Sequence, residues 1–106
     1  MNNTRIEQAV LRAGGRDFEP LRELATFQDQ VAYLQIALED FPDDAQYIAH
    51  ILGQIAKAQG MTDVAKKSDL GRESLYKSLS GEVDPNLSTI LKVIKAVGLK
   101  LQMVPA

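Results

Sequence analysis

Apolar residues recur at helical spacing over most of the chain, and the first clear case follows Thr26. The Thr26 hydroxyl can cap a helix, and Asp29 three residues later can accept from the first turn. Pro42 then ends the helix, because proline lacks the backbone N–H that an interior position needs. The apolar positions fall at offsets 0, 3, 7 and 10, which predicts one buried face: Val31, Leu34, Leu38 and Phe41.

The strongest amphipathic pattern lies between Asp43 and Gln59. Asp43 or Asp44 can cap this helix, and Gly60 after it predicts a left-handed C-cap. Apolar residues at offsets 0, 3, 4 and 7 predict the buried face of the helix: Ile48, Ile51, Leu52 and Ile55.

Three shorter helices are predicted next. Thr62 can cap the first, which runs to about Ser68, and the second covers Arg72–Leu79. Asn86 opens the third helix, and Gly98 closes it. The third helix has apolar residues at offsets 0, 3, 4 and 7, which predict its buried face: Leu87, Ile90, Leu91 and Ile94.

The two ends of the chain carry weaker patterns. A helix is predicted over Thr4–Ala13, stopped by the glycines at 14 and 15, while residues 16–25 are ambiguous. Leu99–Met103 alternates apolar and polar residues, which is typical of a strand, and Pro105 ends it. Such a strand can pair with its mate across a two-fold axis or fold back onto its own core, and the pattern does not choose between them.

The composition is that of one small domain, with 106 residues, 45% hydrophobic and 25% charged. With Cys 0 and His 1, disulfides, thiolate or histidine metal sites and cysteine catalysis are excluded, and we expect no cofactor or metal. No apolar run approaches the roughly 20 residues of a membrane helix. No signal peptide opens the chain, so the sequence predicts a cytoplasmic protein without a membrane partner.

Three residues among the short helices have the spacing of a helix-turn-helix. Ala65 is small enough for a second helix to cross close over the first. Asp69, four positions later, tolerates the positive φ that the turn needs. Leu75, six positions further on, can fill the gap between the two helices. Any three-helix bundle can show such spacings, but the amphipathic helices Asp43–Gln59 and Leu87–Val97 stand where a five-helix phage-repressor-like domain needs them.

Longer runs of sequence resemble a known family. From about Thr26 to Val104 the chain resembles addiction-module antidote proteins, which are HigA-like antitoxins with a Cro/phage-repressor-type helix-turn-helix. It departs from the family at Asp63, where similar proteins often carry glutamine, and at Gly71, which replaces the usual serine or threonine cap. The matching runs are Gly60–Thr62, Leu70–Ser80, Asp84–Thr89 and Lys92–Leu99.

The resemblance implies an all-α fold with a DNA-binding domain. The five-helix phage-repressor-like domain would cover residues 43–98, with an N-terminal helical extension over 1–42 and a tail or short strand over 99–106. Such proteins bind and neutralise a small RelE/ParE-like toxin, and they repress their own operon by binding its operator. Affinity in this architecture usually comes from a homodimer on a palindrome with half-sites about one turn (~34 Å) apart.

The helix at Arg72–Leu79 would be the one that reads DNA. Its first turn enters the major groove, so Arg72, Glu73 and Ser74 lie nearest the base edges. Arg72 can bind guanine O6 and N7 through its two-pronged guanidinium. Side chains of the next turn can reach phosphates or a base edge. Two lysines at the end of the preceding helix can contact the DNA backbone. Each lysine can equally be ordinary surface charge. These further candidates are Tyr76, Lys77, Ser80, Lys66 and Lys67.

The formal net charge of −2 first argues against nucleic acid, but the charge divides unevenly. Residues 1–42 hold four basic and seven acidic residues, a net −3, whereas residues 43–106 hold eight and seven, a net +1. The acidic first part can be an ordinary solvated surface, or it can bind a small basic toxin. In this part and just after it, the apolar residues are more than one helix face needs. They are candidate partner contacts, but they can equally pack the core or a dimer interface: Tyr33, Leu34, Ile36, Phe41 and Tyr47.

Three other classes of function are alternatives to an antitoxin. An enzyme is not expected, because the sequence holds no Gly-rich phosphate loop, no nucleophile with a base, no paired carboxylates on one helix face and no metal-ligand spacing. A free-standing transcriptional regulator without a toxin would have the same domain, and the neighbouring reading frame would separate the two. An interaction module that has lost DNA binding is the third alternative, kept open by Asp63 and the negative total charge.

Overall fold

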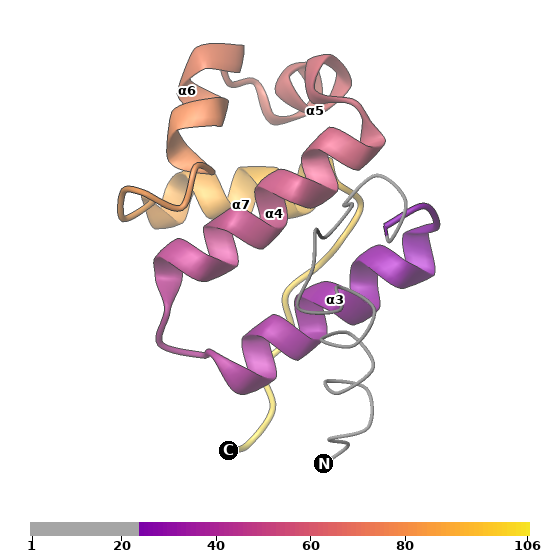
Figure 1. Cartoon of the computed structure of the whole chain (residues 1–106), viewed down its shortest axis with the longest axis vertical. Helices are drawn as coiled ribbons and strands as arrows, with labels where there is room; N and C mark the ends of the chain where they lie inside the picture. The colour runs from indigo at the N-terminus through magenta and orange to yellow at the C-terminus, as the bar shows by residue number, and fades with distance from the viewer. Residues whose placement is uncertain (1–23) are drawn as a thin grey trace, which may run out of the picture.

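A computed structural model describes residues 24–106, and in that range the chain forms five α-helices and no strand (Figure 1). The expected all-α class is confirmed. The helix predicted over Thr4–Ala13 and most of the ambiguous segment 16–25 lie outside the described residues. Over residues 24–106, no helix has the length and apolar character to span a membrane. The helices are α3 (Phe27–Asp40), α4 (Ala45–Gln59), α5 (Met61–Ser68), α6 (Arg72–Ser78) and α7 (Leu87–Ala96).

Two side-chain caps begin the two longest of these helices, as predicted. The backbone N–H of Asp29 donates to Oγ1 of Thr26 at 3.0 Å, which caps α3. The backbone N–H of Tyr47 donates to Oδ1 of Asp44 at 2.9 Å, so Asp44 rather than Asp43 caps α4. Local sequence therefore decides where both helices start.

The junction of α4 and α5 differs from the prediction. The predicted Thr62 cap is wrong, because α5 already begins at Met61 and has no side-chain cap. Gly60 serves as the C-cap of α4 and the N-cap of α5, with φ 111° and ψ 108°. Its φ is positive as expected, but its ψ lies outside the left-handed helical region, so the predicted left-handed cap is also wrong. A single glycine turns the chain from one helix directly into the next.

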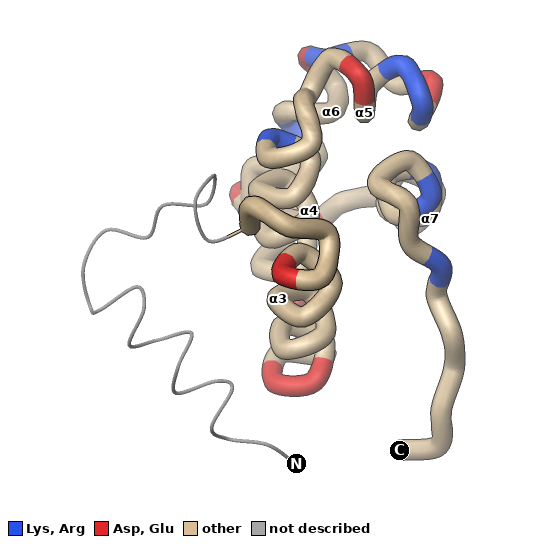
Figure 2. Tube along the Cα trace, turned by 90° about the vertical axis from the view of Figure 1, so that its right-hand side faces the viewer, with Lys and Arg blue, Asp and Glu red and all other residues tan. Residues whose placement is uncertain are grey.

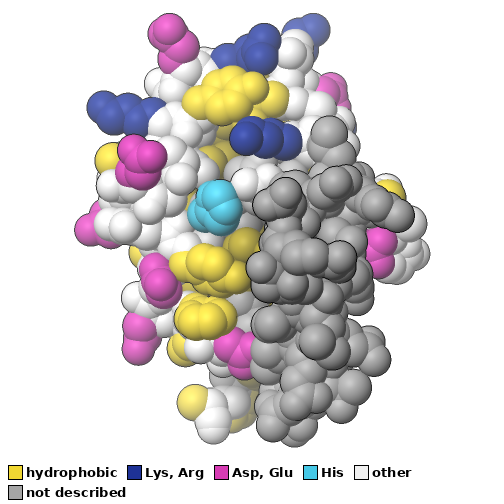
Figure 3. Space-filling model, viewed as in Figure 1, with side chains coloured by type: hydrophobic (Ala, Val, Ile, Leu, Met, Phe, Trp, Pro, Cys, Tyr) yellow, Lys and Arg dark blue, Asp and Glu magenta, His cyan; other side chains and the backbone are white. Residues whose placement is uncertain are grey.

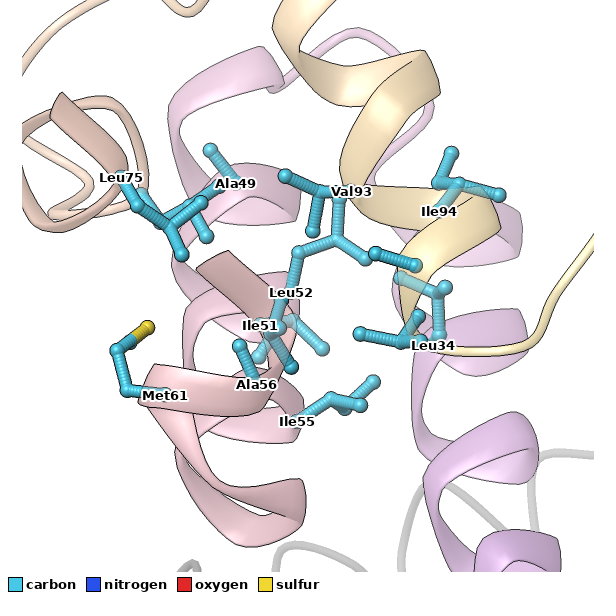
Figure 4. Packing of buried hydrophobic residues seen from close by; sticks show 14 of the residues in the cluster. Leu34, Ala49, Ile51, Leu52, Ile55, Ala56, Met61, Leu75, Val93 and Ile94 are labelled. Atoms are coloured by element: carbon cyan, nitrogen blue, oxygen red, sulfur yellow. The ribbon is translucent and has the colours of Figure 1, made fainter. Parts of the chain in front are cut away.

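α4 lies at the centre of the core. Its residues Ile51, Leu52 and Ile55 are almost fully buried, which confirms the predicted face, and Ile48 is partly buried. Side chains from each of the other four helices pack around them (Figure 4). The neighbours labelled in the figure are Leu34 from α3, Met61 from α5, Leu75 from α6, and Val93 and Ile94 from α7.

The predicted buried faces of α3 and α7 are only partly correct. On α3, Leu34 is buried but Leu38 and Phe41 are exposed, because α3 packs on α4 through a narrower stripe that also includes Ala37 and Gln30. On α7, Leu87 and Leu91 are 69% and 45% exposed. The core side of α7 consists instead of Val93, Ile94, Ala96 and Val97, since α4 and α5 reach the helix from that direction.

The predicted strand at 99–103 is not formed within the chain. The N–H of Leu99 donates to the carbonyl of Ile94 at 2.9 Å, and Leu99 packs against the core. After it the chain runs on without regular structure, and Leu101, Met103 and Val104 are exposed. A strand needs a ladder partner, and the helical part of the chain that the structure describes offers none. Pairing with a second copy stays a prediction.

Candidate nucleic-acid and partner interfaces

The residues predicted to form a helix, a turn and a second helix occupy the expected positions. Ala65 is buried on α5, and its carbonyl accepts from the N–H of Leu70 at 3.1 Å. Asp69 ends α5 at φ 60° and ψ 36°, in the left-handed region. Leu75 on α6 has no exposed surface. A main-chain hydrogen bond therefore closes the turn between α5 and α6, and the buried Leu75 side chain packs between the two helices.

α6 is fixed to the core through its inner face. Leu75 and Leu79 point inward and are buried, as predicted. Gly53 on α4 lies under the end of α6, where a Cβ atom would stand 2.8 Å from the carbonyl oxygen of Leu79. Only glycine lets the two backbones approach this closely. The packing of its inner side thus fixes how α6 is oriented and which of its residues face solvent.

The outer side of α6 carries the candidate base contacts. Arg72, Glu73, Ser74, Tyr76 and Lys77 are all exposed. Nη2 of Arg72 donates to the hydroxyl of Tyr76 at 3.4 Å, and the Arg72 guanidinium carbon lies 5.8 Å from the centre of the Tyr76 ring. A cation–π contact of this kind restricts the conformations of the arginine side chain and leaves its positive charge unneutralised. Gly71 provides no side-chain cap to the helix, as its identity predicts.

The lysines of α5 are not equivalent. Nζ of Lys67 forms an ion pair with Oδ2 of Asp63 at 3.0 Å, whereas Lys66 is exposed without a carboxylate partner among the described residues. An isolated carboxylate at Asp63 would repel a DNA phosphate. In the fold Lys67 neutralises this carboxylate, which lowers the repulsion of phosphate. The same ion pair engages one of the two lysines that were predicted to contact the DNA backbone. Lys66 remains the more available of the two lysines.

Ser80 follows α6 and forms two hydrogen bonds within its own turn. Its Oγ donates to the carbonyl of Lys77 at 2.9 Å and accepts from the N–H of Glu82 at 3.1 Å. The hydroxyl therefore shapes the turn after α6. Sequence reasoning missed Lys57, which lines a cavity of about 250 Å³ together with Tyr76 and Ser80. No spacing signal links Lys57 to α6, because packing of α4 against α6 brings them together.

Within residues 24–80, basic and acidic side chains lie in different parts of the molecule. Residues 57–80 hold five Lys or Arg and three acidic residues, whereas residues 24–56 hold five acidic residues and no Lys or Arg. In Figure 3 the dark blue side chains all lie in the upper part of the face, toward α5 and α6. In Figure 2, α3 and the turn to α4 carry only acidic positions. Within residues 24–80 the charge therefore divides into a basic pole at α5 and α6 and an acidic pole at α3 and the turn to α4, while Lys92, Lys95 and Lys100 lie on α7 and the tail.

The predicted partner contacts at the acidic pole divide into inner and outer residues. Leu34 is buried in the core and is not available to a partner in this fold. Ile36 and Tyr33 are half-buried, and burial, with neighbouring Tyr47, raises the pKa of Tyr33 to about 12. Phe41 is 47% exposed and stacks edge-on against Tyr47 with ring centres 4.8 Å apart.

An acidic cavity of about 550 Å³ lies beside Phe41 at the turn between α3 and α4. Asp84, far along the chain, joins it because Nε2 of Gln46 donates to Oδ1 of Asp84 at 3.1 Å. Oδ2 of Asp40 is buried without a hydrogen-bond partner. The carboxylates at the cavity suit a cationic group better than a metal ion, since no set of three or more possible ligands is placed to hold a metal within residues 24–106. They are Asp40, Asp43, Asp44 and Asp84.

The chain is similar to known proteins of one family. Residues 16–105 match the model of a family described as probable addiction module antidote protein. An uncharacterized protein from Haemophilus influenzae is 35% identical over 88 residues, which cover 83% of this chain and 89% of the relative. No solved structure matches. The family match spans most of the chain, and the chain belongs to the family of probable addiction module antidote proteins.

Proposed function

We propose that this protein is the antitoxin of a type II toxin–antitoxin pair, which binds a RelE/ParE-like toxin and represses its own operon by binding the operator. The observation that carries the proposal is the division of α6, with Leu75 and Leu79 anchored in the core and Arg72 exposed at the start of the outer side. Neither activity requires a catalytic group or a cofactor, and both would take place in the cytoplasm, where the operator is.

In this proposal α5 and α6 act as a Cro/phage-repressor-type helix-turn-helix within residues 43–98. Arg72 binds a guanine edge in the major groove, and its cation–π contact with Tyr76 restricts where the guanidinium can lie. Glu73 and Ser74 adjoin it in the first turn. The remaining contacts are to phosphates and position the helix without specifying sequence. They come from Tyr76, Lys77, Lys66, Lys67 and the turn at Ser80.

Operator binding requires two copies of the protein in this proposal. α6 has 7 residues and is about 10 Å long, so one copy reads only a few base pairs. The small excess of basic over acidic residues between 57 and 80 predicts weak non-specific binding. A homodimer on a palindromic operator, with half-sites about 34 Å apart, supplies the missing affinity.

The toxin binds at the opposite, acidic pole. A RelE/ParE-like toxin that contacts RNA is basic, and the four aspartates of the cavity beside Phe41 complement such a surface. Phe41 and the outer edge of Tyr47 add apolar contact next to the charged groups, while Tyr33 and Ile36 support them from the half-buried side. The two poles allow toxin and operator to be bound by different surfaces of one small protein.

Two experiments test the two halves of the proposal. In the first, affinity for DNA from the protein's own promoter is measured against salt concentration, and we expect tight, strongly salt-dependent binding. Absence of binding would remove the operator half. In the second, the protein is co-expressed with the product of the adjacent reading frame, and we expect co-purification and rescue of growth. Promoter binding without any toxin from that frame would instead favour a free-standing regulator with the same domain.

A further inference from the structure

We infer that a backbone phosphate of the operator binds in a cavity between α4 and α6, with Lys57 of α4 as its main cation. The inference rests on the proposed operator binding, and it adds a DNA contact from a helix outside the helix-turn-helix. We call this space the α4–α6 cavity. It has a volume of about 250 Å³, and it is lined by α4, the first residue of α5, α6 and the turn after α6.

Two close contacts determine how α4 and α6 lie against each other. A Cβ atom on Gly53 would stand 2.8 Å from the carbonyl oxygen of Leu79, where α6 ends. One turn earlier on α4, the Cβ of His50 would stand 3.1 Å from a Cβ atom on Gly81. Later residues of α4 therefore face earlier residues of α6.

Lys57 and Tyr76 are the next residues in this order, and both border the α4–α6 cavity. Lys57 follows Gly53 by one turn, and Tyr76 precedes Leu79 by one turn. Beyond that close approach the two helices diverge, and α4 runs on toward α5 (Figure 1). Leu79 and Met61 line the cavity and are buried, whereas Lys57 and Tyr76 are exposed. The cavity therefore has an apolar floor and a polar rim.

The rim of the cavity provides positive charge and hydrogen-bond donors. Lys57 forms no ion pair with a carboxylate of residues 24–106. The hydroxyl of Tyr76 accepts from Nη2 of Arg72 at 3.4 Å, so its own proton is free to donate. Nε2 of Gln54 carries two protons and lies 3.4 Å from Nε2 of His50, where it uses at most one of them. No carboxylate is among the described residues that line the cavity, so its chemistry suits an anion with several acceptor oxygens, such as a phosphate.

Lys57 is not part of a general basic surface on α4. It is the only Lys or Arg between residues 24 and 65, and it lies in the last turn of the helix. The aspartates of the acidic cavity lie at the opposite end of α4. A basic toxin would be attracted to those aspartates and repelled by Lys57. The charge of the α4–α6 cavity therefore favours DNA over the toxin.

Tyr76 joins the α4–α6 cavity to the candidate base contact. The guanidinium carbon of Arg72 lies 5.8 Å from the centre of the Tyr76 ring. A helix in the major groove, which is about 12 Å wide, has a phosphate backbone on each side. With Arg72 at a base edge, the cavity beside Tyr76 lies toward one of these backbones. A phosphate bound there would fix the register and orientation of α6 in the groove without specifying sequence.

The salt dependence of DNA binding by the full chain tests the inference. Fluorescence anisotropy measures the affinity for the operator duplex and for a scrambled duplex at several salt concentrations. Lys57→Ala should lower the salt slope by about 0.9 and weaken binding to both duplexes by about 3–10-fold, because it removes one phosphate contact. Lys57→Arg keeps the charge and should retain the native slope. Lys95→Ala is the matched control, since it removes an exposed lysine from the last turn of α7, and it should also retain the native slope.

Uncharged phosphates in the DNA locate the contact. Single phosphates of the operator are replaced in turn by methylphosphonate, which carries no charge. We expect one position in each half-site at which the replacement weakens binding of the native protein by about 3–10-fold and has no further effect on Lys57→Ala. Additive losses at every position would overturn the inference, because Lys57 would then contribute only general charge attraction.

Circular dichroism and urea unfolding check that the variants are folded, as expected for an exposed helix position that receives alanine. A folded Lys57→Ala with the native salt slope would overturn the inference and leave operator binding intact. Loss of toxin binding in this variant with an unchanged slope would overturn it in favour of the toxin. Absence of promoter binding by the native protein would remove the operator proposal and this inference together.

Discussion

The side-chain amides of Gln30 and Gln59 are hydrogen-bonded to each other at 2.8 Å, with Nε2 of Gln59 donating to Oε1 of Gln30. Gln30 is 5% exposed, and its own Nε2 donates to the carbonyl of Leu24 at 3.0 Å. Gln59 also donates to the carbonyl of Val97 at 2.9 Å. Two amides therefore join the start of α3, the end of α4 and the end of α7.

Replacement of Gln59 by alanine tests this connection. Gln59→Ala leaves the Oε1 of Gln30 and the carbonyl of Val97 without their donor, so the free energy of unfolding should fall by about 1–3 kcal/mol. Urea denaturation measures the loss. Gln54→Ala on the same helix removes only a long 3.4 Å contact with His50 and should cost less than about 0.5 kcal/mol. Equal losses in the two variants would show that the amide bridge does not stabilise the fold.

The close approach of α4 and α6 predicts opposite effects at two glycines. Gly53→Val should lower the free energy of unfolding by about 1–3 kcal/mol, because its Cβ would meet the Leu79 carbonyl at 2.8 Å. In Gly71→Ser the added Cβ meets no atom within 4 Å, and the serine hydroxyl provides the missing cap of α6. The free energy of unfolding should therefore rise by roughly 0.3 kcal/mol. Thermal unfolding of both variants checks the signs. A neutral Gly53→Val would mean that α6 is free to move away from α4.

Two basic residues of α6 should affect DNA binding in different ways. Arg72→Ala should weaken operator binding by about 10–100-fold and reduce discrimination at one base pair, because a bidentate base contact is lost. Lys77→Ala should weaken binding to all sequences alike and lower the salt slope by about 1, because it removes one phosphate contact. Fluorescence anisotropy with operator and scrambled duplexes measures both. If Arg72→Ala weakens the two duplexes to the same extent, Arg72 does not read a base.

The acidic cavity predicts a change in partner binding without a change in DNA binding. Asp43→Asn, at an exposed aspartate of the cavity, should weaken binding of the co-expressed toxin by about tenfold, which corresponds to the loss of one charge-assisted hydrogen bond. Isothermal titration calorimetry with the product of the adjacent reading frame measures this affinity. Asp29→Asn makes the same change on α3 outside the cavity and should have little effect. The two variants behaving alike would indicate general charge attraction rather than a specific contact.

Tyr33 predicts a loss of stability at alkaline pH. Burial, with neighbouring Tyr47, raises its pKa to about 12 from the 10.0 of an ordinary tyrosine. The folded state therefore retains the phenol proton that the unfolded state releases, so the contribution is complete below pH 10 and is lost as the pH rises toward 12. Tyr33→Phe should lose less stability than the native protein between these values. Urea denaturation at several pH values compares them, and parallel losses in both proteins would contradict the shifted pKa.

The sequence by itself determined the parts of this protein that depend on neighbouring residues. Thr26 and Asp44 cap their helices as predicted, Asp69 takes the left-handed conformation of the turn, and Leu75 and Leu79 lie on the inner side of α6. Each of these features is set by contacts within a few positions of the chain, so local spacing is enough to predict it. The exposed residues of α6, and with them the candidate DNA contacts, follow from the same periodicity.

Only the tertiary structure decided which apolar side of a helix is covered and which distant residues meet. Leu87 and Leu91 have the spacing of core residues, yet they are exposed because α4 and α5 approach α7 from another side. Gln30 reads as a surface residue, yet it is buried because Gln59 and the Leu24 carbonyl satisfy its amide. Asp84 joins the acidic cavity through Gln46. Periodicity shows that a helix has an apolar side, but the packing of elements distant in sequence determines whether another helix lies against it.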